Sequence, residues 1–506
     1  MRRRTYFVLL CLVLGFAGSA RAQDTAAKIV DQYIKAAGGS KALSRIRTVS
    51  LEGAATRAGG ASGTYTLDTK LPNRYYSELI LGEKRLIEAY NGKSAWRQDA
   101  SGEIATLLGP ESIQLQAMAQ IANTHLRDLK RNKLAITLVG HAPVRGKDAW
   151  QVEVSAMNGV KHEIFFDPVT HLIVKEAAPF AGVNEEIFYD DYRPESGVRL
   201  PRKIELRRGT DTYSIDITQA VVNGAIGERV FDLPVKSQVH LPDLKALFKE
   251  IAANQKAIDK IKENYAGTRT EDETEYEGNG KVTKRHENEY TFFYLDGEEI
   301  SMLAKKGGKP LSEAEQRKET EKAQKRVEEI QKREAKKDAK EEKAKAEGKE
   351  DKEDKEEEVD IEMFLRACQF VNPRRERFRG QDVLVFDFEA NPEYKPRKLL
   401  EKIVQKLAGV IWIDEKAHDV ARLEAYFVND AKIAGGLLAT VHQGTGFVFE
   451  QAFINNEVWL PTYEEAHGSA RVLLVKGFRA SEVTRYSDYK KFRVETLKTI
   501  GAPKQP

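Results

Sequence analysis

Two stretches of the chain, about 250 residues apart, carry the same three landmarks in the same order. Residues 145–154 and 379–388 each begin with Arg-Gly and continue into alternating apolar residues. Next, residues 162–171 and 410–418 each end a strand-like run at an Asp, with a His four residues on (Asp167 and His171, Asp414 and His418). Val198-Arg-Leu-Pro201 and Val458-Trp-Leu-Pro461 complete the series. Such self-similarity predicts two copies of one β-rich domain.

The first 22 residues have the composition of an export signal. Arg2, Arg3 and Arg4 precede an apolar run over residues 6–16, and Ala20-Arg21-Ala22 fits the small-residue rule for cleavage. The run is short for a membrane span, which favours a cleaved signal over the alternative, an uncleaved anchor. Removal of residues 1–22, which hold four Arg and no acids, changes the formal charge to 3 − 4 = −1. That balance gives no electrostatic case for binding nucleic acid.

Hydrophobic periodicity divides the rest into helices and strands. Helical spacing is found over residues 24–46, 111–130, 243–262 and 397–407, and a period of two dominates the segments between them. We therefore expect an α+β chain: a first domain over 23–235, a second over 236–310 and 360–495, and a tail over 496–506. Cleavage leaves Cys368 as the single thiol, and its neighbours Ala367 and Phe370 favour burial.

A charged insertion interrupts the second domain over residues 311–359. It consists largely of Glu, Lys, Ala and Gln, with opposite charges spaced for pairs four apart. Val327 and Ile330 stand isolated, so we expect a solvated helix, about 54 Å long if it covers 312–347, that ends in disorder near Gly348. A tolerated surface insertion and a spacer or docking arm are both open interpretations.

Catalytic and metal-binding signatures are missing from the sequence. The nine His form no His-Glu-x-x-His pattern, a single Cys excludes Cys-rich metal sites, and there is no Gly-x-Ser-x-Gly. For His171 and His418 a role in the turn is favoured over metal binding. We therefore expect no metal, no cofactor and no catalytic residue, although residues distant in sequence could still converge into a hydrolase site.

Several stretches resemble the outer-membrane lipoprotein-sorting family, the LolA/LolB-like proteins. They are the Ala36-Ala-Gly-Gly39 helix end, residues 164–172, Pro194-x-x-Gly-Val-Arg-Leu-Pro201 and Phe231-x-Leu-Pro234. The resemblance implies a curved antiparallel sheet, covered by helices, around an apolar hollow that holds lipoprotein acyl chains. It also implies an early-strand Arg that holds a lid helix, for which Arg57 is the candidate. The chain differs from the single-domain carriers of this family in two ways: we expect two tandem half-barrels, and the second contains the charged insertion.

The leading hypothesis is thus a periplasmic carrier or chaperone, from a Gram-negative-type bacterium, that binds a lipid or lipoprotein acyl chain. Transient membrane contact is compatible with it. The alternative is a sensing or protein-interaction module with filled interiors, like regulators of the sigma-E system, that binds an envelope protein; a hydrolase is the third. Strand alternation and the helix over 111–130 suggest the following residues as lining of the hollow: Trp96, Met118, Leu126, Trp150, Phe165, Phe188, Phe386, Trp412, Phe427 and Phe449.

Overall fold

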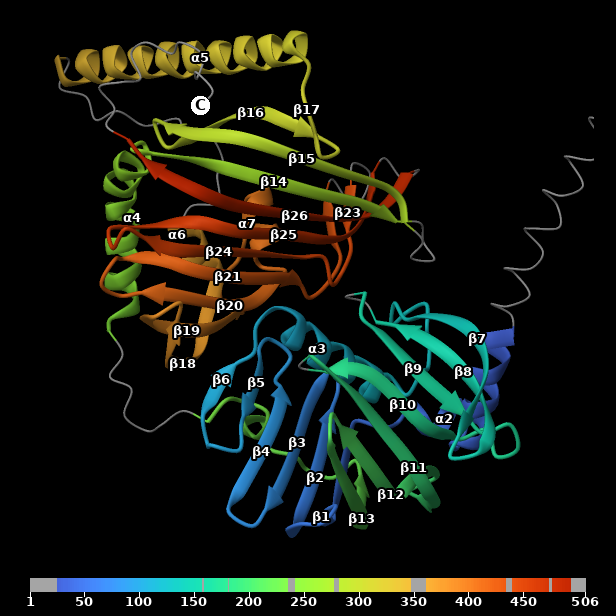
Figure 1. The fold of residues 1–506 in the computed structure, drawn as a ribbon. Helices are drawn as coiled ribbons and strands as arrows, with labels where there is room; N and C mark the ends of the chain where they lie inside the picture. Colours follow the sequence, from blue (N-terminus) through green and yellow to red (C-terminus); the bar gives the residue numbers. More distant parts are fainter. Residues whose placement is uncertain are drawn as a thin grey trace, which may run out of the picture. The chain divides into compact units, whose positions relative to one another are not determined.

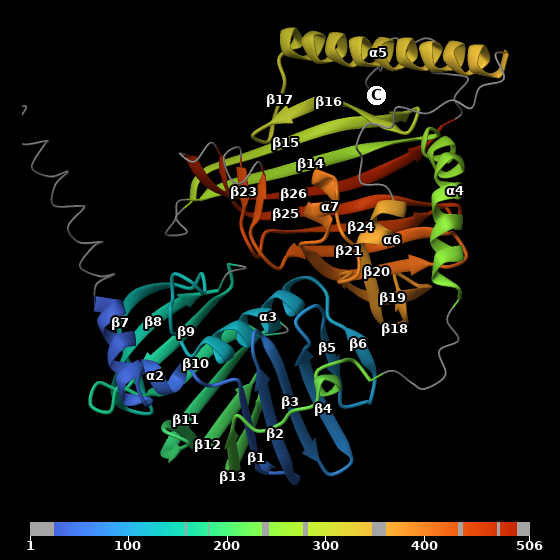
Figure 2. The same cartoon turned by 180° about the vertical axis from the view of Figure 1, so that it is seen from behind.

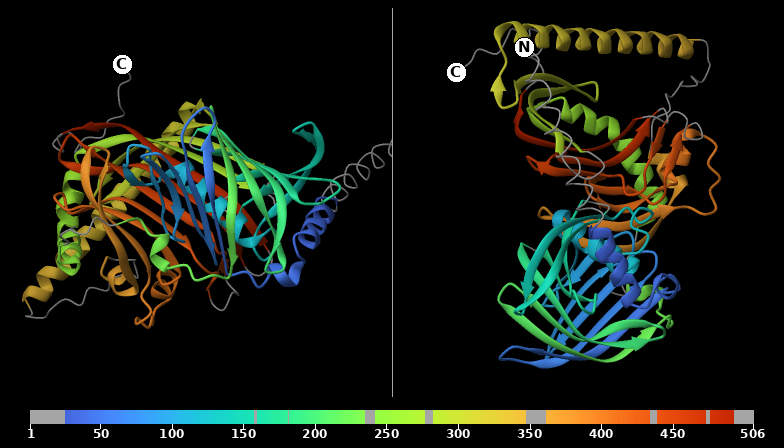
Figure 3. Two further views of the ribbon diagram at one scale, coloured as in Figure 1. Left: turned by 90° about the horizontal axis from the view of Figure 1, so that it is seen from below. Right: turned by 90° about the vertical axis from the view of Figure 1, so that its right-hand side faces the viewer.

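The computed structural model describes residues 25–156, 159–180, 182–234, 242–276, 282–346, 361–433, 439–472 and 476–492. These residues form two compact units, residues 1–234 and 235–506. Each unit is a large, strongly curved antiparallel sheet with a few helices (Figures 1 and 3). The expected α+β class with curved antiparallel sheets is confirmed at this level. The export signal predicted at 1–22 and the tail at 496–506 lie outside the described residues.

The sheet of unit 1 is one continuous ribbon of 13 strands in its described part. Its order is β6-β5-β4-β3-β2-β1-β13-β12-β11-β10-β9-β8-β7. The strands are β1 (Thr48–Arg57), β2 (Ser62–Lys70), β3 (Arg74–Leu81), β4 (Lys84–Tyr90), β5 (Ala95–Gln98), β6 (Ile104–Thr106), β7 (Ala135–Val144), β8 (Lys147–Ser155), β9 (Lys161–Phe166), β10 (Ile173–Phe180), β11 (Val183–Glu195), β12 (Val198–Arg208) and β13 (Asp211–Val222). The first and last strands pair in the middle of the ribbon, from Val49 opposite Val222 to Arg57 opposite Tyr213.

One face of this sheet, here called its helix face, is covered by a helix over residues 25–36, by α2 (Ser40–Leu43) and by α3 (Gly109–Thr124). The opposite face is called the back face; residues near Phe231, just after the turn η1 (Glu228–Val230), cover part of it. Gly109 and Pro110 begin α3, and His125 ends it in the left-handed conformation, with φ 49°. The helix is therefore shorter at its C-terminal end than the predicted 111–130.

Unit 2 follows a similar order in its described residues: β17-β16-β15-β14-β26-β25-β24-β21-β20-β19-β18 (Figure 2). The strands are β14 (Tyr265–Tyr276), β15 (Val282–Leu295), β16 (Glu298–Lys306), β17 (Lys309–Pro310), β18 (Cys368–Phe378), β19 (Gln381–Ala390), β20 (Leu407–Asp414), β21 (Asp419–Phe427), β24 (Gly446–Ile454), β25 (Val458–Val472) and β26 (Lys476–Lys491); a small hairpin of β22 (Ala431–Ile433) and β23 (Ala439–Val441) pairs with β25. Again the first and last strands, β14 and β26, pair in the middle of the ribbon.

Three helices pack on the helix face of unit 2: α4 (Leu244–Lys262), α6 (Ile361–Ala367) and α7 (Leu399–Val404). Asp243 caps α4, since its carboxylate accepts hydrogen bonds from the backbone N–H groups of Lys245 and Ala246. Cys368 is buried in the same core, as its apolar neighbours predicted, and burial raises the pKa of its thiol to about 12.

The charged segment forms a 34-residue helix, α5 (Glu313–Ala346), at the top of Figure 1. Glu315 accepts bonds from both the backbone N–H and the hydroxyl of Ser312, which fixes its start. The expectation that its apolar residues are isolated is wrong. Ala323 and Ile330 are buried and Val327 is half-buried, because their spacing of four and three residues places all three against the back face of β15 and β16.

The Ile330 contact generates a stability prediction. Ile330→Ala should lower the free energy needed to detach and unfold α5 by about 2–4 kcal/mol. The reason is that the Ile330 side chain, which packs against Ile300, is only 1% exposed. Hydrogen exchange should then show faster exchange along α5 while β19 and β20 stay protected. Gln324→Ala, an exposed position on the same helix, is the control. Equal exchange in both variants would show that α5 does not depend on this contact.

Candidate functional site

The structure divides the ten predicted lining residues between the two faces. In unit 1, Met118 and Trp150 lie half-buried, and Leu126 buried, on the helix face. Phe386 and Phe427 lie on the helix face of unit 2, and Phe449 joins them because it pairs directly with Leu423 of that core. The other four, Trp96, Phe165, Phe188 and Trp412, point to the back faces. In each unit the predicted lining residues therefore lie on both faces of the sheet. Contact with a ligand remains a prediction for the six that lie on the helix faces.

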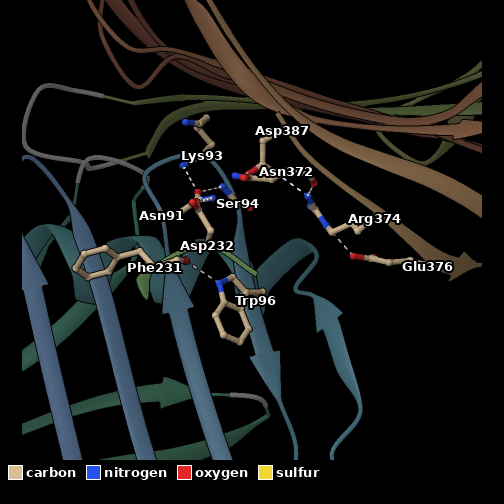
Figure 4. Close-up of polar contacts among 10 residues, drawn as sticks. All are labelled: Asn91, Lys93, Ser94, Trp96, Phe231, Asp232, Asn372, Arg374, Glu376 and Asp387. Atoms are coloured by element: carbon tan, nitrogen blue, oxygen red, sulfur yellow. Dashed lines mark hydrogen bonds and ion pairs between the residues drawn. The ribbon is translucent and has the colours of Figure 1, made fainter. Parts of the chain in front are cut away.

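Trp96 packs under the chain that closes unit 1. Its indole N–H donates a 2.8 Å hydrogen bond to the carbonyl of Phe231, and Asn91 donates to Asp232 at 3.0 Å (Figure 4). These bonds attach the residues that follow η1 to the back face of β4 and β5. Trp96 therefore has a structural role: its ring packs in the core, and its only polar group, the indole N–H, is already hydrogen-bonded.

Phe165 and Phe188 lie under basic side chains on the back face. The Lys175 ammonium is 4.9 Å from the ring centre of Phe165, and Arg145 and Arg207 are 4.7 and 4.6 Å from that of Phe188. Each cation is also paired with a carboxylate, for example Arg145 with Glu205 at 2.7 Å. The two rings are therefore covered by cation–π contacts rather than facing a hollow.

The helix face of unit 1 carries an ion network that the sequence did not reveal. Arg208 contacts both oxygens of Glu88, at 2.8 and 2.9 Å, and Glu185 at 2.6 Å. Both carboxylates are buried, and burial raises the pKa of Glu185 although Arg208 acts in the opposite direction. The network joins β4, β11 and β12, which lie on the two sides of the β1–β13 pair. It therefore fixes the curvature of the sheet with charges at the place where an apolar hollow was expected.

A second carboxyl group, that of Glu176, lies on the same face and forms no ion pair with any residue that the structure describes. Burial raises the pKa of Glu176 to about 7, and a hydrogen bond with Tyr189 only partly offsets this. Glu185 adds a smaller repulsion. His162, also buried there, lies 3.3 Å from the side-chain amide of Gln114 on α3, and burial lowers its pKa to about 4. Burial thus favours the neutral form of both groups in this polar part of the interior.

Unit 2 presents the opposite chemistry on its helix face. Aromatic rings from two helices and four strands meet there, and we call this set the phenylalanine face. Ring centres lie 5.0 Å apart for Phe248–Phe370 and for Phe364–Phe388, and 6.1 Å apart for Phe370–Phe386. The phenylalanine face consists of Phe248, Phe364, Phe370, Phe386, Phe388, Phe427, Phe447 and Phe449.

Strand register shows how this face is built. One row of cross-strand neighbours runs Phe370, Phe388, Gly409, Ala425, Phe447. Gly409 is required there, because a Cβ would meet the carbonyl oxygen of Glu424 at 1.8 Å and the Phe388 ring at 2.9 Å. Between Phe388 and Phe447 the row therefore contains only the small residues Gly409 and Ala425. Five of the eight rings remain half-buried rather than buried: Phe364, Phe370, Phe427, Phe447 and Phe449.

The back face of the same strands is charged and closely paired. Trp412 lies there beside Arg422, whose guanidinium is 5.6 Å from the ring centre. Arg374 bonds to Asp387 at 3.0 Å and to Glu376 at 2.9 Å, with both Arg374 and Asp387 buried (Figure 4). Alternation thus gives β18–β21 one apolar and one ionic face.

Arg57, the candidate latch, lies at the end of β1 and is about half exposed. Its guanidinium bonds to Asp211 of the neighbouring strand β13, at 2.5 Å from Nη2 and 3.1 Å from Nε. It therefore joins two strands of the sheet instead of a strand and a helix.

The two repeated His residues stand at matching turns. His171 and His418 both have positive φ, 58° and 48°. The Asp before each accepts backbone N–H bonds: Asp167 from Thr170 at 2.6 Å, and Asp414 from Lys416 at 2.8 Å. This geometry is that of a turn closed by Asp. Among the described residues, no group of three His, Cys, Asp or Glu side chains is placed to hold a metal ion.

No family model matches the chain, and no curated protein matches it. Its solved structural neighbours include DUF1329 and LolA-superfamily proteins. A DUF1329 family protein from Desulfovibrio piger is 13% identical and covers 41% of this chain and 97% of its own, with a TM-score of 0.28. A LolA superfamily protein from Nitrosomonas europaea is 12% identical over 41% and 96%, with a TM-score of 0.27. The Pseudomonas aeruginosa MucA/MucB complex is 9% identical over 92% and 99%, with a TM-score of 0.18.

None of the helices in the described part of the chain is both long enough and apolar enough to cross a membrane.

Removing the centre of the unit 1 ion network should be costly. Arg208→Met should lower the free energy of unfolding by about 3 kcal/mol, because the buried Glu185 would lose its Arg208 pair and the buried Glu88 would keep only the longer contact with Arg97, at 3.6 Å. Urea denaturation measures this. Arg193→Met removes an exposed pair with Asp191 and should change it by less than about 1 kcal/mol. Similar losses in the two variants would contradict a special role for the buried network.

Glu176 predicts a pH dependence. Its folded pKa of about 7 lies above the ordinary value of 4.5, so its stability contribution is fully present below about pH 4.5 and is lost as pH rises through 7. Glu176→Gln should remove that loss. The difference in unfolding free energy between variant and wild type should grow between pH 4.5 and 7, by about 1.4 kcal/mol per unit at most. A difference that does not change with pH would contradict the raised pKa.

Proposed function

We propose that this is an exported, non-enzymatic binding protein whose phenylalanine face, in unit 2, holds an acyl chain. The single observation that carries the proposal is the incomplete cover of that face. Rings such as Phe427, Phe447 and Phe449 are placed by register on the side where helices pack, yet they keep part of their surface in contact with solvent. Partly exposed aromatic rings gathered on one face are typical of a binding surface.

The energetics fit an acyl chain without any special polar motif. Each CH₂ removed from water contributes about 0.8 kcal/mol. Ten such groups would offer roughly 8 kcal/mol before the cost of association, which leaves room for micromolar affinity. Register places three charged residues on this face of β18 and β19: Arg377 opposite Asp382, and Arg375 opposite Leu384. They lie toward the turn that joins the two strands, beyond the row that contains Phe370 and Phe388.

Unit 1 is less suited to this role. Arg208, Glu88 and Glu185 occupy its helix face, and an acyl chain lying against them would remove charged groups from their remaining water. We therefore assign the acyl chain to unit 2 and a closed, stabilised interior to unit 1. Periplasmic export by the segment at 1–22 is part of the same proposal.

We also propose that the two units are copies of one fold. Both pair their first and last strands, and the landmarks found in the sequence fall on corresponding turns. Arg145-Gly146 and Arg379-Gly380 each have two successive positive φ values, 50° and 77° against 48° and 83°. If a protease site is engineered between residues 235 and 241, each released fragment should still unfold cooperatively. A fragment that is unfolded alone would count against independent copies.

The lipid proposal is tested by two matched substitutions on β24. Phe449→Ser alters the phenylalanine face, whereas Phe453→Ser alters a half-buried ring on the back face, next to Trp459. With residues 23–506 and a fluorescent C16 fatty acid, Phe449→Ser should weaken binding about tenfold and Phe453→Ser less than twofold. Native mass spectrometry should detect lipid retained through purification. No saturable binding, or equal losses in the two variants, would overturn the proposal.

A further inference from the structure

Five glutamates gather around one arginine on the helix face of unit 2, in its other half, and we call this set the acidic strip. Arg269 of β14 is the arginine; it pairs with Glu299 at 2.6 Å and with Glu271 at 2.8 Å. The acidic strip consists of Glu271, Glu273, Glu299, Glu464 and Glu482. Register brings them together from four strands: β14, β16, β25 and β26.

Arg269 compensates only part of the negative charge on this strip. Glu273 and Glu482 are direct cross-strand partners, an arrangement that destabilises a sheet when both are ionised. Among the side chains that the structure describes, Glu273, Glu464 and Glu482 form no ion pair with Lys, Arg or His. Burial raises the pKa of Glu299 to about 6, and it also raises the pKa values of Glu464 and Glu482. Neighbouring carboxylates add to the rise, whereas Arg269 and, for Glu464, a hydrogen bond from Tyr486 act against it. The folded chain keeps this repulsion, although unpaired carboxylates could be placed at lower cost elsewhere.

Two buried hydrogen-bond donors give independent support for a ligand at this strip. Tyr294 is only 6% exposed, and its hydroxyl has no hydrogen-bond partner within the described structure. The neighbouring Tyr489 hydroxyl donates its proton to the carbonyl of Pro461 at 2.7 Å, so it does not donate to Tyr294. Tyr294 is the direct cross-strand partner of Glu299, so it faces the strip. The Nε–H of Arg269 is likewise buried without an acceptor.

Tyrosine rings surround these groups. Tyr290 lies under the Arg269 guanidinium, 4.7 Å from ring centre to carbon, and Tyr486 is the cross-strand partner of Arg269. Phe292, between them, packs edge-on against Tyr294, Tyr486 and Tyr489, with ring centres 5.5 to 5.7 Å apart. Aromatic faces beside carboxylates suit the aliphatic stems and cationic ends of long basic side chains.

We propose that the acidic strip binds a lysine- or arginine-rich polypeptide segment. Its ammonium or guanidinium groups neutralise Glu464, Glu482 and Glu273, and its backbone carbonyls accept from Tyr294 and Arg269. A small cation would use the carboxylates alone and leave both donors without a partner; nucleic acid would be repelled. The site goes beyond acyl-chain binding and does not depend on it, although Glu464 is the cross-strand neighbour of Phe449.

The probe is a fluorescein-labelled hexalysine peptide, measured by anisotropy with residues 23–506. Glu464→Gln/Glu482→Gln should weaken binding at least tenfold, flatten its salt dependence, and leave the melting temperature unchanged or higher, because a repulsion is removed. The matched control, Glu287→Gln/Glu289→Gln, removes two charges from the back face of β15 and should change binding less than twofold.

Two further measurements separate a peptide site from simple charge attraction. Tyr294→Phe should weaken hexalysine binding about threefold without changing its salt dependence, and fully acetylated hexalysine should not bind. Equal affinity for spermine, which carries charge but no carbonyl groups, would overturn the peptide assignment. Unchanged hexalysine binding in Glu464→Gln/Glu482→Gln would overturn the site itself, whatever the result with the fatty acid.

Discussion

The pairing of each unit's first strand with its last is the interaction on which the rest depends. In unit 1, β1 joins β13, and in unit 2, β14 joins β26. Without that central pairing, each sheet would separate into two smaller meanders with no common curved face. The cost of closing so long a loop is met by many backbone hydrogen bonds formed together. Helix packing, the ion network and both proposed binding surfaces all require the continuous ribbon.

The two helix faces show that one architecture can carry opposite interiors. In unit 1, Arg208 ties strands from both halves of the ribbon through Glu88 and Glu185. In unit 2, phenylalanines cover one half of the face, and the acidic strip with its tyrosines occupies the other. Because burial of unpaired charge costs more than burial of rings, the chemistry of each half restricts which ligand could lie against it. Fold alone therefore does not determine cargo.

The sequence allowed much of the framework to be predicted. Helical spacing located α3 and α4, and the Arg-Gly and Asp turns were readable from a few residues. Which face a strand side chain occupies was harder. Phe165 and Phe166 are adjacent, so alternation requires one on each face but does not say which; Phe166 packs with Tyr33 on the helix face. Bulges such as that between Ile173 and Lys175 shift the pattern further.

Partners distant in sequence could not be predicted at all. Arg208 and Glu88 are 120 residues apart, and no local pattern connects them. The acidic strip draws on strands from both ends of unit 2 in the same way. For the phenylalanine face the sequence held a weak signal, since Phe386 and Phe388 are two residues apart on β19 and therefore lie on the same face. Only the register that sets Phe370 beside Phe388 gives that signal meaning.

Central pairing of the chain ends has a consequence for where these sheets can grow. The outermost strands, β6 and β7 in unit 1 and β17 and β18 in unit 2, are joined mid-chain, by the segments that contain α3 and α5. A connection between two free edges can lengthen without disturbing a single register. Evolution can therefore attach new material there at little cost to folding, and α5, docked through Ile330 on the nearest strands, marks that position in unit 2.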